Sequence, residues 1–263
     1  MLKGNIDDVA SPASHFVKSD LRSKDGADKN SALLTNMDAF CLKPLEYLNV
    51  TTMSAAIDLL LELFSGINHS MAVESSYFYE KIAEYVRCTG TVKATVLDEL
   101  NNTWHSKRYA GMKLKDHESI VFSIHNINHF FVVKMVPCEY KLVVYDSLFQ
   151  KKGTLTQIHE TVCKNLVTFL NASHEKFGPK GGYVRKPLSA WTKVKQADYP
   201  LQHEQGCEPK DSPGVDCGIF VLLCISRLLT NRNFDFNQQY IYDNETRLRI
   251  FYNIYNRDFS SFL

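Results

Sequence analysis

The chain has 263 residues, of which 44% are hydrophobic and 22% charged, and its formal net charge at pH 7 is +1. These values are ordinary for a globular protein of one large or two small domains, with a core that needs no disulfide staples. The charge gives no reason to expect a nucleic-acid partner, and no apolar run reaches the roughly 18 to 20 residues that a membrane span needs.

The seven cysteines are scattered, with no CxxC pair and no zinc-finger spacing. We therefore expect no metal site, and most of these cysteines resemble small apolar side chains of a reducing compartment, the cytoplasm or the nucleus.

The chain divides into two parts of different composition. Residues 1–40 mix Ser, Asp, Lys and Asn with little periodicity, which predicts a flexible N-terminal leader. The alternative is a cap that docks on the domain through residues 15–17. We expect a single folded domain over residues 41–263.

Helices are predicted on both sides of a β region. Apolar residues at 53, 56, 57, 60, 61 and 64 have helical spacing, with Asn49 or Thr51 as cap and Gly66 as stop. Further helices are predicted over 77–87 and 92–102. After the β region come helices over 155–177, from Cys217 onward and over 244–259, the second of them nearly all apolar and therefore buried.

The β region consists of three short runs rich in β-branched and aromatic residues: SIVFSIHN, HFFVVKMV and YKLVVYDSL. The second and third runs are joined by a connection of hairpin length. The order of elements predicts an α+β domain, with a central mixed or antiparallel sheet flanked by helices.

Cys217 has a neighbourhood that suits a thiol nucleophile. It follows the polar segment PKDSPGVD and opens the apolar helix, so the helix N-terminus favours thiolate over thiol. Its backbone N–H is one of the unpaired donors of the first turn and can help to form an oxyanion hole. Gly218 has no side chain to crowd the reacting carbonyl.

His129 begins the second β run and Asp146 ends the third. If these runs pair as an antiparallel hairpin, the two residues meet at one edge of the sheet, where a carboxylate can hold an imidazole in its working tautomer. Singly, Cys217 is more often a core residue, His129 a polar edge residue and Asp146 a turn former. Their combination favours Cys217 as nucleophile, His129 as base and Asp146 as the group that orients it.

Three segments, NINHFFVV, VVYDSL and VDCGIFVL, resemble in this order the motifs of the SUMO/sentrin-type protease family, cysteine peptidases of clan CE. Weaker similarities are YLNVTTMSAAIDLL, SSYFYEKI and the closing FDFNQQYIYDNETRLRIFYNIY. The resemblance implies a papain-like core with the nucleophile at the N-terminus of a buried helix. It also implies hydrolysis, through an acyl-thioester, of the peptide or isopeptide bond after the C-terminal Gly-Gly of a ubiquitin-like modifier.

The expected partners are therefore SUMO, NEDD8 or ubiquitin and their conjugates, with no cofactor and a monomeric enzyme. The family also has an oxyanion Gln shortly before the Cys, but Asp211 stands at the ungapped position here. Gln202 fits best, because Pro200-Leu201-Gln202 repeats the family's Pro-x-Gln form, and Gln205 is the second choice.

The substrate-binding residues implied by the resemblance are Phe130, Tyr47 and Trp191. Phe130 replaces the Trp that follows the family's catalytic His and can still close an apolar slot over two glycines. Tyr47 opens the segment that replaces the family's Trp-Leu-Asn-Asp. Val50 at the end of that segment removes a carboxylate that, in the family, can pair with a basic residue of the modifier.

Three other functions remain open at this point. A protease that matures a viral or transposon polyprotein would use the same residues. A same-fold acetyltransferase effector, acting in a host cytosol, would need a basic cofactor pocket, and Lys180, Arg185 and Lys186 are too few to argue for one. A non-catalytic module that binds ubiquitin-like proteins would not need an intact Cys, His and Asp.

Overall fold

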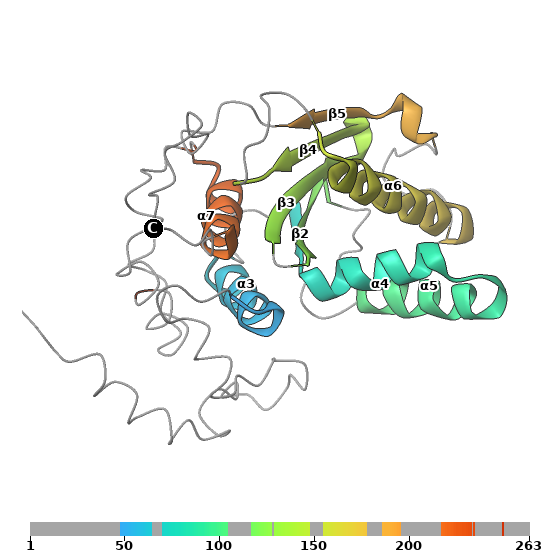
Figure 1. Cartoon of the computed structure of the whole chain (residues 1–263), viewed down its shortest axis with the longest axis horizontal. Coiled ribbons are helices and arrows are strands. Elements are labelled where there is room, and N and C mark those ends of the chain that lie inside the picture. The colour runs from blue at the N-terminus through green and yellow to red at the C-terminus, as the bar shows by residue number, and fades with distance from the viewer. Residues whose placement is uncertain are drawn as a thin grey trace, which may run out of the picture.

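In a computed structural model of the chain, the structure describes residues 48–64, 70–104, 117–127, 129–147, 155–177, 186–195, 217–232, 234 and 249. The predicted leader, the helix stop at Gly66 and nearly all of the predicted helix over 244–259 lie outside these residues. Within them, a five-stranded sheet is flanked by helices, as Figure 1 shows. The predicted α+β class is confirmed.

The sheet is mixed, with its five strands in sequence order. Its three inner strands are antiparallel neighbours, and a short strand joins each edge in parallel. The strands are β1 (Met71–Glu74), β2 (Ser119–Asn126), β3 (His129–Val136), β4 (Lys141–Tyr145) and β5 (Thr192–Lys195). The inner three confirm the sequence prediction, whereas β1 and β5 are additional.

The predicted β3–β4 hairpin is confirmed, with Val132 opposite Tyr145 and Val136 opposite Lys141. Its connection is a turn of 3-10 helix over Pro137–Glu139, followed by Tyr140 with a φ of 51°. Pro137 suits the first position of such a turn, because its missing N–H would have no helical partner there.

The helices match the sequence prediction within a few residues. Asn49 caps the first of them, because the backbone N–H of Thr52 donates to Asn49 Oδ1 at 2.8 Å. The helices are α3 (Val50–Phe64), α4 (Ser76–Arg87), α5 (Gly90–Trp104), α6 (Gln157–Phe177) and α7 (Cys217–Thr230).

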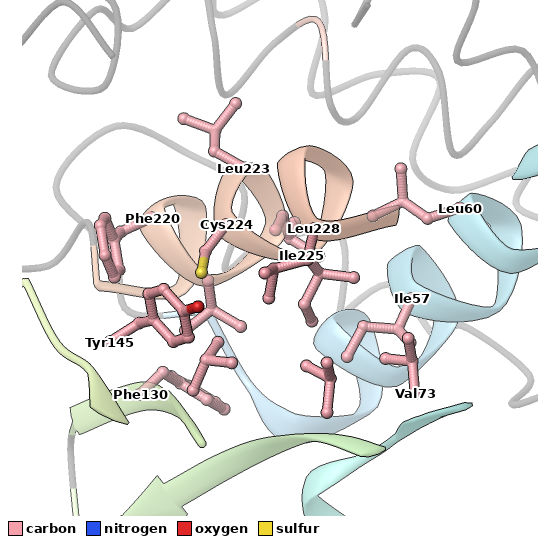
Figure 2. Close-up of a cluster of buried hydrophobic side chains, with 14 of the residues drawn as sticks. Ile57, Leu60, Val73, Phe130, Tyr145, Phe220, Leu223, Cys224, Ile225 and Leu228 are labelled. Atoms are coloured by element: carbon pink, nitrogen blue, oxygen red, sulfur yellow. The ribbon is translucent and has the colours of Figure 1, made fainter. Parts of the chain in front are cut away.

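Two hydrophobic clusters fill the two faces of the sheet. One contains α3 and α7, and the other contains α4, α5 and α6. Side chains along β3 alternate between them, with Phe130 on the α7 side and Phe131 on the α6 side. Figure 2 shows α7 packed on the first face. All residues of α7 except Arg227 and Thr230 are buried, which explains its nearly continuous apolar sequence.

Gly218 lies where α7 meets Leu48, two residues before the start of α3. A Cβ built on Gly218 would lie 2.8 Å from Leu48 Cδ1 and 3.1 Å from Leu48 Cβ. Leu48 is only 3% exposed and belongs to the α3–α7 cluster. The glycine therefore permits close packing of Leu48 against the start of α7, in addition to any space it leaves for a substrate.

We expect Gly218→Ala to lower the free energy of unfolding by about 1–2 kcal/mol, because overpacking costs more than the helix propensity that Ala restores. Urea unfolding measures the change. In a Leu48→Ala background the same substitution should cost less, because Cδ1 of Leu48, the nearest atom at 2.8 Å, is gone while its Cβ at 3.1 Å remains. Equal losses in the two backgrounds would show that Leu48 does not exclude a side chain at position 218.

Candidate active site

Cys217 is the first residue of α7 and is 4% exposed. Its Sγ accepts a hydrogen bond from the backbone N–H of Phe130, at 3.4 Å. The backbone amides of the first helical turn point toward the same end of α7, where the helix dipole favours negative charge. The start of β3 therefore supplies a donor to this thiol, which lies at the N-terminal end of α7.

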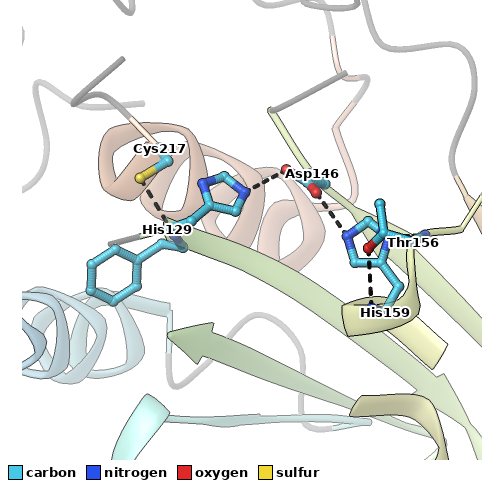
Figure 3. A network of polar contacts seen from close by, with 6 residues as sticks. His129, Asp146, Thr156, His159 and Cys217 are labelled. Carbon is cyan, nitrogen blue, oxygen red and sulfur yellow. Dashed lines mark hydrogen bonds and ion pairs between the residues drawn. The ribbon is translucent and has the colours of Figure 1, made fainter. Parts of the chain in front are cut away.

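His129 and Asp146 lie side by side at one end of the sheet. The β3–β4 register places Phe131 level with Asp146, and His129 lies two residues further along on the same side of β3. The Nε2 atom of His129 is 2.7 Å from Oδ1 of Asp146. Figure 3 shows the imidazole between Cys217 and Asp146. The structure thus brings together the three residues that the sequence selected.

The electrostatics of this group favour a protonated imidazole beside an ionised carboxylate. Burial lowers the pKa of His129, but hydrogen bonds to Asp146 and Cys217 and their negative charges outweigh it and raise the pKa to about 9. Burial raises the pKa of Asp146, but hydrogen bonds from His129 and His159 outweigh it and lower the pKa to about 2. At neutral pH, His129 is therefore a cation held by Asp146.

Comparison with solved structures gives long matches at low sequence identity. The SUMO protease Ulp1, with its catalytic cysteine oxidised to a sulfinic acid, matches with a TM-score of 0.63 and 14% identity over 95% of this chain and 93% of that one. The C-terminal Ulp1 protease domain in complex with Smt3, the yeast orthologue of SUMO, gives 0.61 and 14% over 95% and 94%. The Chaetomium thermophilum Ulp1-like SUMO protease catalytic domain gives 0.58 and 16% over 96% and 89%.

This chain has the fold of the Ulp1-like SUMO protease domains. The papain-like core expected from the sequence is thereby confirmed. No family model and no curated protein matches the chain by sequence. Fold similarity alone does not transfer an activity, so a function has to be inferred from the residues of the site.

A fourth residue of the site in this Ulp1-like fold is His159, which the sequence analysis did not select. Its Nε2 atom is 2.7 Å from Oδ2 of Asp146, on the opposite side of the carboxylate from His129. His159 is 2% exposed and lies in the first turn of α6. The available signal was Thr156-Gln157-Ile158-His159, a helix start with a polar residue three positions after the cap.

Of the predicted substrate-binding residues, Phe130 adjoins the site. Its backbone contacts Cys217, its side chain is 2% exposed, and its ring packs 4.5 Å from that of His125. The ring that the resemblance places over two glycines is therefore buried in this structure, and its substrate-binding role stays a prediction.

Trp191 does not belong to the site, and this prediction was wrong. It directly precedes β5, whose first residue, Thr192, is paired with Lys141 at the far end of β4 from Asp146. Its ring is buried 5.7 Å from that of Tyr140, in the cluster on the α6 side. The ring of Trp191 therefore packs in the hydrophobic core beside β5.

Tyr47, Gln202, Gln205 and Asp211 lie outside the described residues, so their assignments stay predictions. Among the residues that the structure describes, no group of three or more His, Cys, Asp or Glu side chains is arranged to hold a metal ion. No helix in the same part of the chain is long and apolar enough to cross a membrane.

We expect an NMR titration of the His129 ring to show a midpoint at about pH 9, well above the ordinary value of 6.5. Asp146→Asn and Cys217→Ser should each lower the midpoint, because each removes a negative partner. The raised pKa means that protonated His129 stabilises the fold below pH 6.5 and that this contribution is lost as the pH rises through about 9. A midpoint near 6.5 in the unsubstituted protein would contradict the ion pair.

Proposed function

We propose that the chain is a cysteine peptidase that hydrolyses the peptide or isopeptide bond after the C-terminal Gly-Gly of a ubiquitin-like modifier. The observation that carries this proposal is the alignment of Cys217, His129 and Asp146 at the N-terminus of a buried helix. A thiol beside an imidazolium that a carboxylate holds in place is the arrangement of an activated thiol nucleophile.

The proposed reaction has two steps. The Cys217 thiolate attacks the carbonyl carbon of the second glycine, and His129 then gives its proton to the leaving amine as the C–N bond breaks. A water molecule attacks the resulting thioester, His129 takes its proton, and the C–S bond breaks to regenerate the thiolate. The backbone N–H of Cys217 stabilises the oxyanion in both steps, with the side chain of Gln202 as the proposed second donor.

The substrate class rests on two supports. The motifs around His129, Asp146 and Cys217 resemble those of peptidases that act on ubiquitin-like modifiers. Among the solved structures of the same fold, one is a Ulp1 domain in complex with Smt3, the yeast orthologue of SUMO. The reaction requires a reduced thiol, so we place the enzyme in a reducing compartment, the cytoplasm or the nucleus.

The test is labelling by ubiquitin, SUMO and NEDD8 probes that carry an electrophile at the C-terminus. We expect at least one of the three to form a covalent adduct on Cys217, detected by intact mass and peptide mapping. Cys217→Ala should abolish the adduct. His129→Ala should slow its formation strongly, because the thiolate loses its cationic partner.

Cys163 provides a matched control within the chain, because it is a buried cysteine whose burial raises the pKa of its thiol to about 12. Cys163→Ala should leave the adduct unchanged. Labelling by none of the three probes, together with acetyl transfer from a thioester cofactor, would exclude the peptidase and support the acetyltransferase. Cleavage of a polyprotein site without probe labelling would instead support a maturation protease.

We expect Gln202→Ala to lower the turnover of a cleavable modifier fusion by about 10²–10³-fold, the usual loss when an oxyanion donor is removed. The Michaelis constant should change less, because the donor acts mainly in the transition state. Gln205→Ala is the matched control and should retain most of the activity. The reverse result, a large loss in Gln205→Ala and none in Gln202→Ala, would show that Gln205 is the donor.

A further inference from the structure

His159 is a buried polar residue that the proposed reaction does not use directly. It comes from α6, on the opposite face of the sheet from α7, and is only 2% exposed. Its Nε2 atom lies 2.7 Å from Oδ2 of Asp146, the carboxylate oxygen that does not face His129. The hydrogen-bond partners of its two ring nitrogens determine how this buried histidine acts on the carboxylate.

The other ring nitrogen fixes the protonation of His159. The backbone N–H of Thr156 donates to His159 Nδ1 at 3.2 Å, and the backbone N–H of His159 donates to Thr156 Oγ1 at 3.3 Å. This reciprocal pair is a capping box in which His takes the place of the usual Glu or Gln. Because Nδ1 accepts a hydrogen bond, it carries no proton, and the hydrogen of the neutral ring is on Nε2.

Nε2–H of His159 is therefore a neutral donor to Oδ2 of Asp146. The carboxylate is held by an imidazole on each side and cannot turn without losing a hydrogen bond at one of them. His159 occupies Oδ2 of Asp146 and so leaves Oδ1 to His129. The ring of Phe131, 5.0 Å away and roughly perpendicular, packs against His159 and limits its movement.

We infer that His159 is a positioning residue for the proposed peptidase: it holds Asp146 in the orientation that aligns His129 with Cys217. This inference rests on the proposed function, because the peptidase reaction is what the orientation of Asp146 would serve. The geometry it requires can be tested without any modifier, by the tautomer of His159 and by the reactivity of Cys217 toward a small electrophile.

Two substitutions separate the two hydrogen bonds of the ring. The side-chain oxygen of His159→Asn replaces Nδ1 as acceptor for Thr156 but leaves no donor that reaches Asp146. His159→Gln is long enough to place an amide donor near the former Nε2 and is itself a capping-box residue. Asn165→Ala is a control for stability, because it removes a hydrogen bond between α6 and Tyr79 on a part of the helix away from Asp146.

The first measurement is the rate at which iodoacetamide alkylates Cys217 across a pH series, followed by peptide mapping. We expect His159→Asn to slow alkylation at neutral pH on the order of tenfold to a hundredfold, as for outer-shell hydrogen-bond partners of functional histidines at metal sites. The pH dependence of alkylation should change as well, because the imidazolium is no longer aligned with Cys217. His159→Gln should recover most of the rate.

Asn165→Ala should lower the melting temperature and leave the alkylation rate unchanged. The second measurement is the NMR spectrum of the imidazole nitrogens of the unsubstituted protein, which should place the proton of His159 on Nε2. A rate in His159→Asn equal to that of the unsubstituted protein, or a proton on Nδ1, would overturn the inference. Failure of all modifier probes would instead overturn the proposed function, because neither measurement uses a modifier.

Discussion

The buried carboxylate of Asp146 is the constraint on which the site depends. Asp146 is 6% exposed, and burial alone would favour its neutral form. Hydrogen bonds from His129 and His159 reverse this effect and keep the carboxylate ionised. Because those two imidazoles come from β3 and α6, the charge is stable only when the hairpin and the first turn of α6 are both in place.

The site joins the two hydrophobic layers at one end of the sheet. Cys217 belongs to the α7 side, whereas His159 lies in the first turn of α6 on the other side. Phe130 and Phe131, consecutive residues of β3, enter the two clusters separately and adjoin Cys217 and His159 respectively. Consecutive side chains of β3 point to opposite faces of the sheet. This alternation therefore sets the spacing between the thiol of Cys217 on one face and the imidazole of His159 on the other.

Sequence periodicity was sufficient to predict the structure where a long hydrophobic pattern or a simple strand connection determined it. The hairpin followed from two adjacent β runs, and it carried His129 and Asp146 to the same place. The edge strands β1 and β5 have four residues each, and β1 is buried throughout, so neither offers a readable alternation. His159 was missed and Trp191 was assigned wrongly for a related reason. The partner that defines each role, Asp146 or Tyr140, is distant in sequence and is brought near only by the packed sheet.

The two histidines on Asp146 differ in charge because their other nitrogens meet different groups. Nδ1 of His159 faces a backbone N–H, which can only donate, so this ring is neutral. His129 uses Nε2 for Asp146, which leaves Nδ1 for the thiol of Cys217, a group that can give up a proton. Protonation of His129 therefore adds a favourable contact with a thiolate. A proton on Nδ1 of His159 would instead point at the backbone hydrogen of Thr156. One carboxylate thus holds a fixed donor and an imidazole that can exchange its proton with the thiol, an arrangement that suits the proposed thiol catalysis.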